Sequence, residues 1–203
     1  MHAPRRLFLL GFFCLFLGAC DTSPSLPPLA NDAVILAFGD SLTRGTVAPE
    51  AQSYPTQLAQ LSGRTVINAG RPGELSAEGL ARLPALLERH QPDLLLLCHG
   101  GNDWLRKRPP QQLAANLKAM IALAREQNIP VLLIGVPRLS LLVSTADLYQ
   151  TLADELEVAY EDEALAEILA DNRLKSDPIH PNGEGYRRLA QAVYTRLQTL
   201  GAL

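Results

Sequence analysis

The stretch Ala33-Val-Ile-Leu-Ala-Phe-Gly-Asp-Ser-Leu-Thr-Arg-Gly45 decides the fold and holds the first candidate functional residue. Its apolar half, residues 33–38, predicts a buried strand that Gly39 ends. Ser41 follows at the edge where open α/β sheets build their reaction sites, and a serine at a strand-to-helix turn can expose its oxygen beside backbone N–H groups. An isolated Gly-Asp-Ser is more often a plain turn with an N-capping serine. The other parts of a reaction site must therefore come from elsewhere in the chain.

Strands and helices alternate along the rest of the sequence. Further strands are predicted at residues 65–68, 93–98, 130–134 and 158–160, and helices at 54–61, 80–87, 110–124, 148–156, 161–171 and 183–200. Because each crossover carries a helix, the sheet should be parallel. We predict an α/β fold in a single domain, a doubly wound, flavodoxin-like sandwich with a mostly parallel sheet of about five strands flanked by helices. Pro84 should kink its helix or begin a second one, and the acidic segment 161–171 should be a solvated surface.

The N-terminus resembles an export signal. Residues 1–6 are basic and residues 7–17 are almost wholly apolar, but this run is shorter than the roughly 20 residues of a membrane-spanning helix. Leu17-Gly-Ala-Cys20 resembles the lipobox of bacterial lipoproteins, in which the cysteine is lipidated and becomes the new N-terminus. We therefore predict a lipoprotein signal peptide over residues 1–19. The alternative is an ordinary signal peptide that is cut near Ala19.

The predicted mature chain begins at Cys20, the expected lipid attachment site, and would be held at a bacterial membrane. Asp21 resembles the signal that retains Gram-negative lipoproteins at the inner membrane, so the expected location is the periplasmic face of that membrane. A stretch rich in Ser, Pro and Asn follows, which predicts a flexible tether over residues 20–32. The folded domain should then occupy residues 33–203.

Charge and cysteine content narrow the function classes. The whole chain has 18 basic and 21 acidic residues, and loss of Arg5 and Arg6 with the signal leaves 16 basic residues. Clustered Lys and Arg are absent, so no nucleic-acid partner is expected. Cys14 leaves with the signal, so only Cys98 accompanies the lipidated cysteine. It lies in an apolar strand, where we expect an inert core residue and no disulfide.

A serine nucleophile needs a base and donors for the oxyanion. Among the histidines that remain after export, His90 should be an exposed helix cap, and His99 a core or pocket-edge residue. His180 lies in a Pro-flanked loop three residues after Asp177, whose carboxylate can hold one ring nitrogen and leave the other free. Alone, that pair has even odds of being a simple loop hydrogen bond. Together with Ser41 it predicts a catalytic triad.

Two loop residues are candidates for the oxyanion donors. Gly73 and Asn102 each follow an apolar strand, so their loops should meet Ser41 at one sheet edge. Taken singly, Gly73 indicates only a positive φ angle, and Asn102 is typical of an ordinary turn. The convergence of three strand ends is the informative signal.

Four sequence blocks resemble those of the SGNH hydrolases, the GDSL family of esterases and lipases. In chain order they are Phe38-Gly-Asp-Ser-Leu-Thr-Arg-Gly45, Val66-Ile-Asn-Ala-Gly-Arg-Pro-Gly73, Gly100-Gly-Asn-Asp103 and Asp177-Pro-Ile-His180. They span nearly the whole predicted mature chain. The resemblance is strongest to the periplasmic thioesterase, lysophospholipase and arylesterase branch.

The resemblance implies a role for each candidate. Ser41 would attack the carbonyl carbon, His180 would act as general base and then general acid, and Asp177 would orient His180. The N–H groups of Ser41 and Gly73 and the side-chain amide of Asn102 would hold the oxyanion. Water would then hydrolyse the acyl-enzyme, with no cofactor and no metal.

The sequence departs from the family pattern at two places. The second block usually continues Gly-Asp-Thr-Ser, whereas this chain has Gly73-Glu-Leu-Ser76, and His99 stands where the branch tends to have an apolar residue. Neither change removes a residue that makes or breaks bonds, so we expect them to affect loop mobility or substrate preference. Asp40 and Asp103 are expected to support the site structurally rather than to react.

The sequence therefore predicts a serine hydrolase that cleaves carboxylic ester, and potentially thioester, bonds of small acyl substrates such as aryl esters or lysophospholipids. The apolar segment Arg138–Ala146 would line the acyl pocket, although simple packing explains it equally well. An O-acetyl esterase acting on cell-envelope glycans is the alternative enzyme. A lipid-anchored binding module without turnover is a third hypothesis, which the complete set of candidate residues disfavours.

Overall fold

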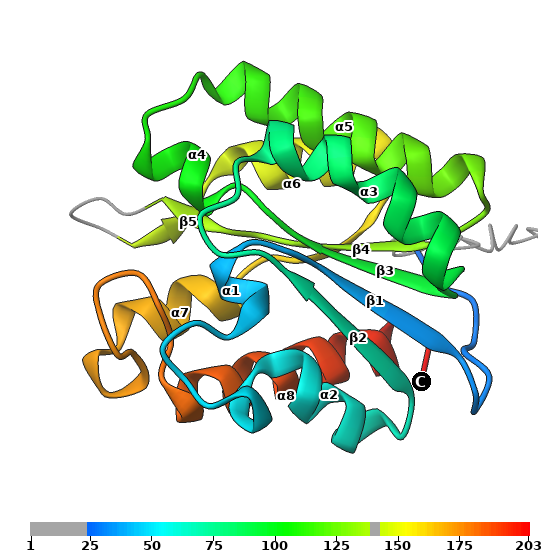
Figure 1. The fold of residues 1–203 in the computed structure, drawn as a ribbon, viewed down its shortest axis with the longest axis horizontal. Coiled ribbons are helices and arrows are strands. Elements are labelled where there is room, and N and C mark those ends of the chain that lie inside the picture. The colour runs from blue at the N-terminus through cyan, green and yellow to red at the C-terminus, as the bar shows by residue number, and fades with distance from the viewer. Residues whose placement is uncertain (1–23, 139–142) are drawn as a thin grey trace, which may run out of the picture.

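The computed structural model describes residues 24–138 and 143–203 (Figure 1). Five strands form the central sheet: β1 (Val34–Gly39), β2 (Thr65–Gly70), β3 (Leu94–Cys98), β4 (Val131–Ile134) and β7 (Ala159–Glu161). All neighbouring strands are parallel, and their order is β2-β1-β3-β4-β7. This is the flavodoxin-like order. It confirms the predicted fold class.

Helices cover both faces of the sheet. They are α1 (Ser41–Arg44), α2 (Tyr54–Ser62), α3 (Ser76–His90), α4 (Gly101–Leu105), α5 (Pro110–Glu126), α6 (Asp147–Leu156), α7 (Ala164–Ala170) and α8 (Gly183–Thr199), with short 3-10 turns at Glu50–Gln52 and Asn172–Leu174. Helix α3 packs against α5 on one face, and α2 packs against α8 on the other (Figure 1). The central strands are buried because both of their faces are covered, which explains the unbroken apolar run Leu94-Leu-Leu-Leu-Cys98.

The site location follows from the strand order. From the centre of the sheet, β1 leads outward to β2, whereas β3 and β4 continue in the opposite direction. A crevice opens at such a reversal, outside the carboxyl ends of the strands. Ser41 follows β1 and Asn102 lies in the segment after β3, and both lie at that crevice.

Two helices differ from their predictions. Helix α3 runs without interruption through Pro84, so a second helix does not begin there. Pro84 is exposed, which lets water satisfy the carbonyl that the proline deprives of its partner. The acidic segment 161–171 is not wholly a solvated surface, because one face of α7 is buried and packs against α8. Within α7 the one acidic residue, Glu167, is exposed, and the other acidic residues of the segment lie before or after the helix.

The segment between β4 and α6 is only partly described. Pro137–Arg138 (β5) pairs with Ser144–Thr145 (β6) in a short antiparallel ladder. Residues 139–142 of the predicted pocket-lining segment lie outside the described residues. Its first residue, Arg138, does line a pocket, which is described below.

The predicted flexible tether does not hold from Pro24 onward. Leu26 and Leu29 are buried, and their backbone N–H groups donate to the carbonyls of Leu200 and Ala202 at 2.9 Å. This segment therefore belongs to the folded unit. The predicted signal peptide, Cys20 and Asp21 lie outside the described residues. Among residues 24–138 and 143–203, no helix is both long and apolar enough to span a bilayer.

Candidate active site

A tight turn after β1 presents Ser41 at the crevice. The side chain of Asp40 accepts a hydrogen bond from the backbone N–H of Leu42 at 3.0 Å and so caps α1. A side chain at position 39 would overlap the carbonyl oxygen of Cys98 in the neighbouring strand, so the close approach of β1 and β3 requires Gly39. Ser41, the first residue of α1, stays partly exposed.

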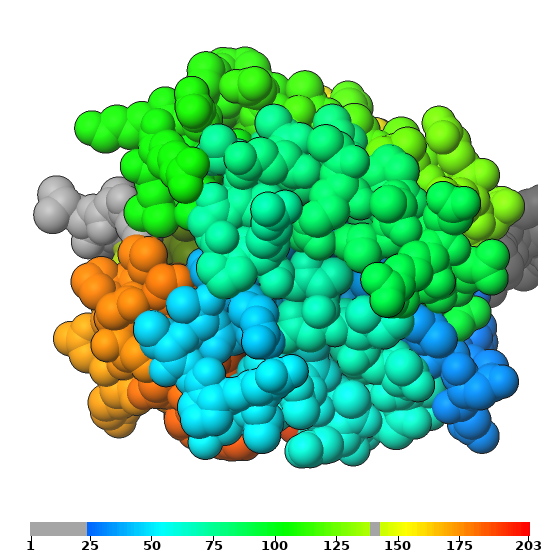
Figure 2. Space-filling view, viewed as in Figure 1, coloured from blue at the N-terminus to red at the C-terminus, as the bar shows by residue number. Residues whose placement is uncertain are grey.

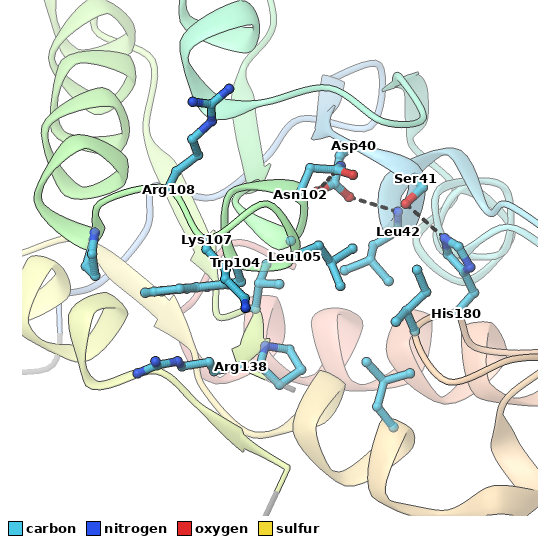
Figure 3. A pocket seen from close by; sticks show the side chains of 16 residues that line it. Asp40, Ser41, Leu42, Asn102, Trp104, Leu105, Lys107, Arg108, Arg138 and His180 are labelled. Carbon is cyan, nitrogen blue, oxygen red and sulfur yellow. Dashed lines mark hydrogen bonds between the residues drawn. The ribbon is translucent and has the colours of Figure 1, made fainter. Parts of the chain in front are cut away.

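The three predicted triad residues form one hydrogen-bonded chain. His180 Nε2 lies 3.0 Å from Ser41 Oγ (Figure 3), and His180 Nδ1 lies 2.8 Å from Asp177 Oδ2. The other carboxylate oxygen of Asp177 accepts hydrogen bonds from the backbone N–H groups of Ile179 and His180, both at 2.8 Å. The loop therefore folds around its own aspartate and fixes the ring. Residues 139 positions apart in the sequence meet within hydrogen-bonding distance.

The electrostatics favour an ionised Asp177. Desolvation raises the pKa of this carboxyl, but the hydrogen bonds from the His180 ring and from two backbone N–H groups outweigh it, so the pKa lies below its ordinary value. An ionised carboxylate accepts a hydrogen bond from Nδ1–H, which leaves Nε2 with a free lone pair toward Ser41. That tautomer is the one a general base requires.

Asn102 lies at the same crevice, at the start of α4. Its side-chain Nδ2 donates to the backbone carbonyl of Glu74 at 3.1 Å and, more weakly, to Asp40 Oδ2 at 3.4 Å. The longer contact can be exchanged for a substrate oxygen at little cost. Gly73 has a φ of 77° and does not line the pocket itself, but it directly precedes Glu74. The two predicted oxyanion loops are thus joined by a hydrogen bond.

The remaining predicted residues have structural surroundings. Both oxygens of Asp103 bind Ser76, one its N–H at 2.9 Å and one its hydroxyl at 2.6 Å, so this carboxylate holds the start of α3. Cys98 is buried, and burial raises the pKa of its thiol. His90 ends α3 and is half-buried rather than exposed. His99 is fully buried, which resolves its placement in favour of the core.

A pocket of about 530 Å³ opens over Ser41, Asn102 and His180. Its wall is largely apolar and includes Leu42, Trp104, Leu105, Pro110, Val136, Pro137, Leu169 and Ile179. Figure 2 shows the surface hollowed between the segment that contains α4, in green, and the segment that contains α7, in orange. Sequence reasoning missed Trp104, although it directly follows the block Gly100–Asp103, and it missed Leu169 because nothing local links α7 to the motif loops.

Three cations border the same pocket: Lys107, Arg108 and Arg138. The Arg138 guanidinium lies 5.5 Å from the centre of the Trp104 ring, a cation–π arrangement that holds it beside the wall (Figure 3). The ion pairs found among the described residues include none of the three. Asp40 is the one acidic residue of the lining in the described part of the chain, and burial raises its pKa.

The arrangement suits acyl transfer. A hydroxyl, an imidazole that can take its proton, a carboxylate behind the imidazole and an amide donor converge on one apolar pocket, which is the combination such chemistry requires. Over residues 24–138 and 143–203, no group of three or more His, Cys, Asp or Glu side chains is placed to hold a metal ion.

Comparisons with known proteins agree with this geometry. The model of the GDSL-like Lipase/Acylhydrolase family matches residues 37–188. The arylesterase of Vibrio mimicus is 34% identical over 206 residues, covering 95% of this chain and 97% of that protein. Thioesterase 1/protease 1/lysophospholipase L1 of Escherichia coli K12 is 33% identical, covering 82% and 84%. Among solved structures, the crystal structure of TesA superposes with a TM-score of 0.74 at 29% identity, covering 82% of this chain and 99% of that one.

The family match covers well over half of the chain and includes every candidate residue of the pocket floor. The relatives are similar along almost their full length. This chain therefore belongs to the GDSL-like lipase/acylhydrolase, or SGNH hydrolase, family and is a carboxylic ester hydrolase of that type.

Proposed function

We propose that Ser41 is the nucleophile of this ester hydrolase, with His180 as its base and Asp177 as the residue that orients the base. The observation that carries this proposal is the continuous Ser41–His180–Asp177 hydrogen-bond chain, which opens onto an apolar pocket. Ser41 Oγ attacks the ester carbonyl while His180 Nε2 takes its proton. His180 then returns the proton to the leaving group, and water repeats the sequence to release the acid.

The negative charge of the tetrahedral intermediate needs donors at a fixed position. The side-chain amide of Asn102, together with the backbone N–H groups of Ser41 and Gly73, is our proposed oxyanion hole. Asn102 gives up its long contact to Asp40 when the substrate oxygen arrives, and its contact to the Glu74 carbonyl keeps the amide in place. Variants of Ser41 and Asn102 that test these roles are described in the Discussion.

We further propose that the substrates are acyl esters with an apolar chain longer than acetyl and an anionic leaving side, such as lysophospholipids. The largely apolar pocket wall suits a hydrocarbon chain, and Lys107, Arg108 and Arg138 suit a phosphate at the mouth. The printed names of two relatives, an arylesterase and a thioesterase/lysophospholipase, are compatible with this class. Aryl esters and thioesters remain within the proposed range because the same chemistry cleaves them.

The substrate proposal is tested with purified mature protein and two substrate sets. A panel of p-nitrophenyl esters from acetate to decanoate should show kcat/KM rising beyond acetate. Preference for acetate would favour the O-acetyl esterase alternative. Labelling of Ser41 by a fluorophosphonate probe separates both enzymes from an inactive binding module, which would stay unlabelled.

Charge recognition is tested separately. Arg138→Gln and Lys107→Gln should each lower kcat/KM for an anionic lysophospholipid by about three- to tenfold, the scale of one exposed charge interaction. They should leave p-nitrophenyl butyrate hydrolysis unchanged. Lys118→Gln is the matched control, since Lys118 pairs with Glu155 away from this pocket. Equal effects on charged and neutral substrates would remove the anionic group from the proposal.

We also propose that the protein is a lipoprotein, anchored through Cys20 at the periplasmic side of the inner membrane of a bacterium. The support is the lipobox-like Leu17-Gly-Ala-Cys20 with Asp21 after it. Packing begins at Pro24, and the four residue steps from Cys20 to Pro24 span at most about 14 Å. The anchor would thus hold the domain close to the lipid surface.

The proposed anchor would be joined to the domain at a point away from the pocket. Leu26 is bonded to Leu200, just after α8, whereas His180 lies just before α8 (Figure 1). A helix of 17 residues is about 25 Å long, which exceeds the reach from Cys20. The pocket would therefore face away from the anchoring surface and take substrates from the aqueous phase.

Cys20→Ser should release the protein from membranes, with Cys98→Ala as the control that stays bound. Unchanged partitioning of Cys20→Ser would refute the anchor.

A further inference from the structure

Glu74 and His99, each at one of the two places where the sequence departs from the family pattern described above, contact each other. Glu74 and His99 are 25 residues apart in the sequence, yet His99 Nε2 lies 3.2 Å from Glu74 Oε2. Glu74 is 3% exposed and His99 is fully buried. Neither residue is required for the proton transfers described above. Their contact therefore needs an explanation of its own.

Arg82 of α3 completes the group. Its Nε and Nη2 donate to the two oxygens of Glu74 at 2.8 and 2.6 Å, and Nη2 also donates to the carbonyl of Ala69 at 3.0 Å. Burial raises the pKa of the Glu74 carboxyl, but the hydrogen bonds from His99 and Arg82 hold it at about 2. The carboxylate is therefore ionised, and His99 Nε2 is the donor in their contact. A bidentate arginine of this kind fixes the carboxylate in direction as well as position.

The surroundings of His99 are shaped for the imidazole. Its ring lies 5.8 Å from the ring of Phe38, and Arg82 stacks on the same phenylalanine at 4.5 Å. A side chain on Gly79 of α3 would overlap the His99 ring, so this helix has its glycine where the imidazole needs space. A glycine inside a helix costs about 1 kcal/mol relative to alanine. Within the described residues, His99 Nδ1 has no partner, so Glu74 is the one polar contact of the ring.

The group sits directly behind the proposed oxyanion hole. Glu74 follows Gly73, and its own carbonyl accepts the hydrogen bond from Asn102. His99 directly follows β3 and precedes Asn102 by three residues. The carbonyl of His99 accepts a hydrogen bond from Tyr149 at 2.8 Å, which holds the start of that loop. One side-chain contact thus connects the loop that carries Gly73 to the loop that carries Asn102.

We propose that the Glu74–His99 contact, braced by Arg82, is a positioning element that sets the separation between Gly73 and Asn102. Glu74 and His99 touch no substrate; they act through the backbone of the two loops. The contact joins the two loops behind the pocket, so loosening it misplaces donors that need to be correct to a fraction of an ångström. This inference rests on the proposed roles of Gly73 and Asn102.

A double-mutant cycle on kcat tests the proposal, using p-nitrophenyl butyrate and the mature protein. Glu74→Gln replaces one acceptor oxygen by a donor that faces Arg82 or His99, and His99→Leu removes the ring donor. Each should lower kcat about tenfold, well short of the 10²–10³ expected for deleting a donor outright, with KM within about twofold. The double variant should be no slower than the slower single variant, because both remove one contact.

A second readout separates positioning from general loosening. The rate of inactivation by a phosphonate ester, whose phosphonyl oxygen occupies the oxyanion site, should fall in parallel with kcat. Wild-type kcat in the folded single variants, whatever happens to Tm, would overturn the proposal. A double variant about 100-fold slower, the product of the single effects, would also overturn it. If Glu74→Gln does not fold, His99→Leu and His99→Asn decide the question, because they leave the Glu74–Arg82 pair intact.

Matched controls come from α3, the helix that carries Arg82. Glu88→Gln and His90→Leu make the same chemical changes on α3, away from the oxyanion loops, and should leave kcat unchanged. Ser41→Ala, measured in parallel, separates a failure of the proposed function from a failure of the positioning inference. Turnover that persists in Ser41→Ala would contradict the proposed function. An inactive Ser41→Ala together with unaffected Glu74→Gln and His99→Leu would contradict only the positioning inference.

Discussion

The molecule contains two histidine–carboxylate pairs in very different surroundings. His180 pairs with Asp177 at 2.8 Å in a loop, and the side chain of Asp177 is 35% exposed. His99 pairs with Glu74 at 3.2 Å in the interior, where both side chains are almost completely buried. In each pair the carboxyl is held below its ordinary pKa by hydrogen bonds, so pairing alone does not distinguish them.

The difference lies at the second ring nitrogen. In His180 the nitrogen opposite the carboxylate faces a serine hydroxyl at the floor of a pocket. In His99 the second nitrogen has no hydrogen-bond partner among the described residues, and the ring is fully buried. A histidine–carboxylate pair acts as a base only when a hydroxyl and a substrate can reach its free nitrogen. The four predictions below test this contrast.

The largest expected effect is loss of the reacting pair. Ser41→Ala and His180→Ala should each lower kcat by about 10⁴–10⁶, as for removal of a triad member elsewhere. His99→Leu should lose only about tenfold by the positioning argument. Initial rates on p-nitrophenyl butyrate measure all three. A His99 variant as slow as His180→Ala would erase the proposed distinction between the two histidines.

The next effect concerns the residue that orients the base. Asp177→Asn should lower kcat by about 10²–10⁴, because an amide donates to Nδ1 and stabilises the wrong tautomer of His180. The matched control is Asp171→Asn in the same region, whose carboxylate pairs with Arg173 and not with the site. Full activity in Asp177→Asn would mean that the backbone of the loop alone orients the ring.

A smaller effect is expected at the oxyanion side. Asn102→Ala should lower kcat by on the order of 10²–10³ with little change in KM, because the donor acts on a charge that develops only in the transition state. Asn172→Ala, an exposed amide in a 3-10 turn, is the control. A change in KM alone would make Asn102 a substrate-binding residue and would remove the target on which the Glu74–His99 contact is proposed to act.

Much of this arrangement could be predicted from local sequence. The strand before Ser41 and the alternation of elements predicted the parallel sheet, and three of the four short blocks contain the residues of the pocket floor. Each block can be recognised from a few neighbouring residues, because a turn or a strand end is determined locally. Asp177 and His180, three positions apart, are such a case, and the structure joins them as expected.

Features that depend on distant contacts were not predicted. Arg82 had no motif, and the sequence presented Glu74 and His99 as two separate departures rather than one contact, because only the tertiary fold brings the loop before α3 beside the residue after β3. Leu26 and Leu29 were placed in a flexible tether, since their burial depends on the end of α8. The polar composition of the surrounding residues favours a tether, although these two apolar side chains pack into the core.

The smallest expected effect contrasts the two pairs through stability. Glu74 has an ordinary pKa of 4.5 when unfolded and a pKa of about 2 when folded. The unfolded chain therefore binds the proton first, so the stabilisation is present above pH 4.5 and is lost as the pH falls toward 2. From pH 5 to pH 3 this group should account for about 2 kcal/mol of the free energy of unfolding. Urea titrations at the two pH values, with wild type and Glu74→Gln compared, measure that share.

Asp177→Asn provides the counterpart in the same titrations. The pKa of the Asp177 carboxyl is also lowered, so its contribution has the same sign, but partial exposure to solvent screens it. We expect its share of the acid-induced loss to be clearly smaller than that of Glu74. Asp177→Asn should therefore lose most of its turnover and little of the pH dependence of its free energy of unfolding. Glu74→Gln should lose mainly that pH dependence. Equal shares would contradict the view that burial makes one pair structural and exposure leaves the other free to react.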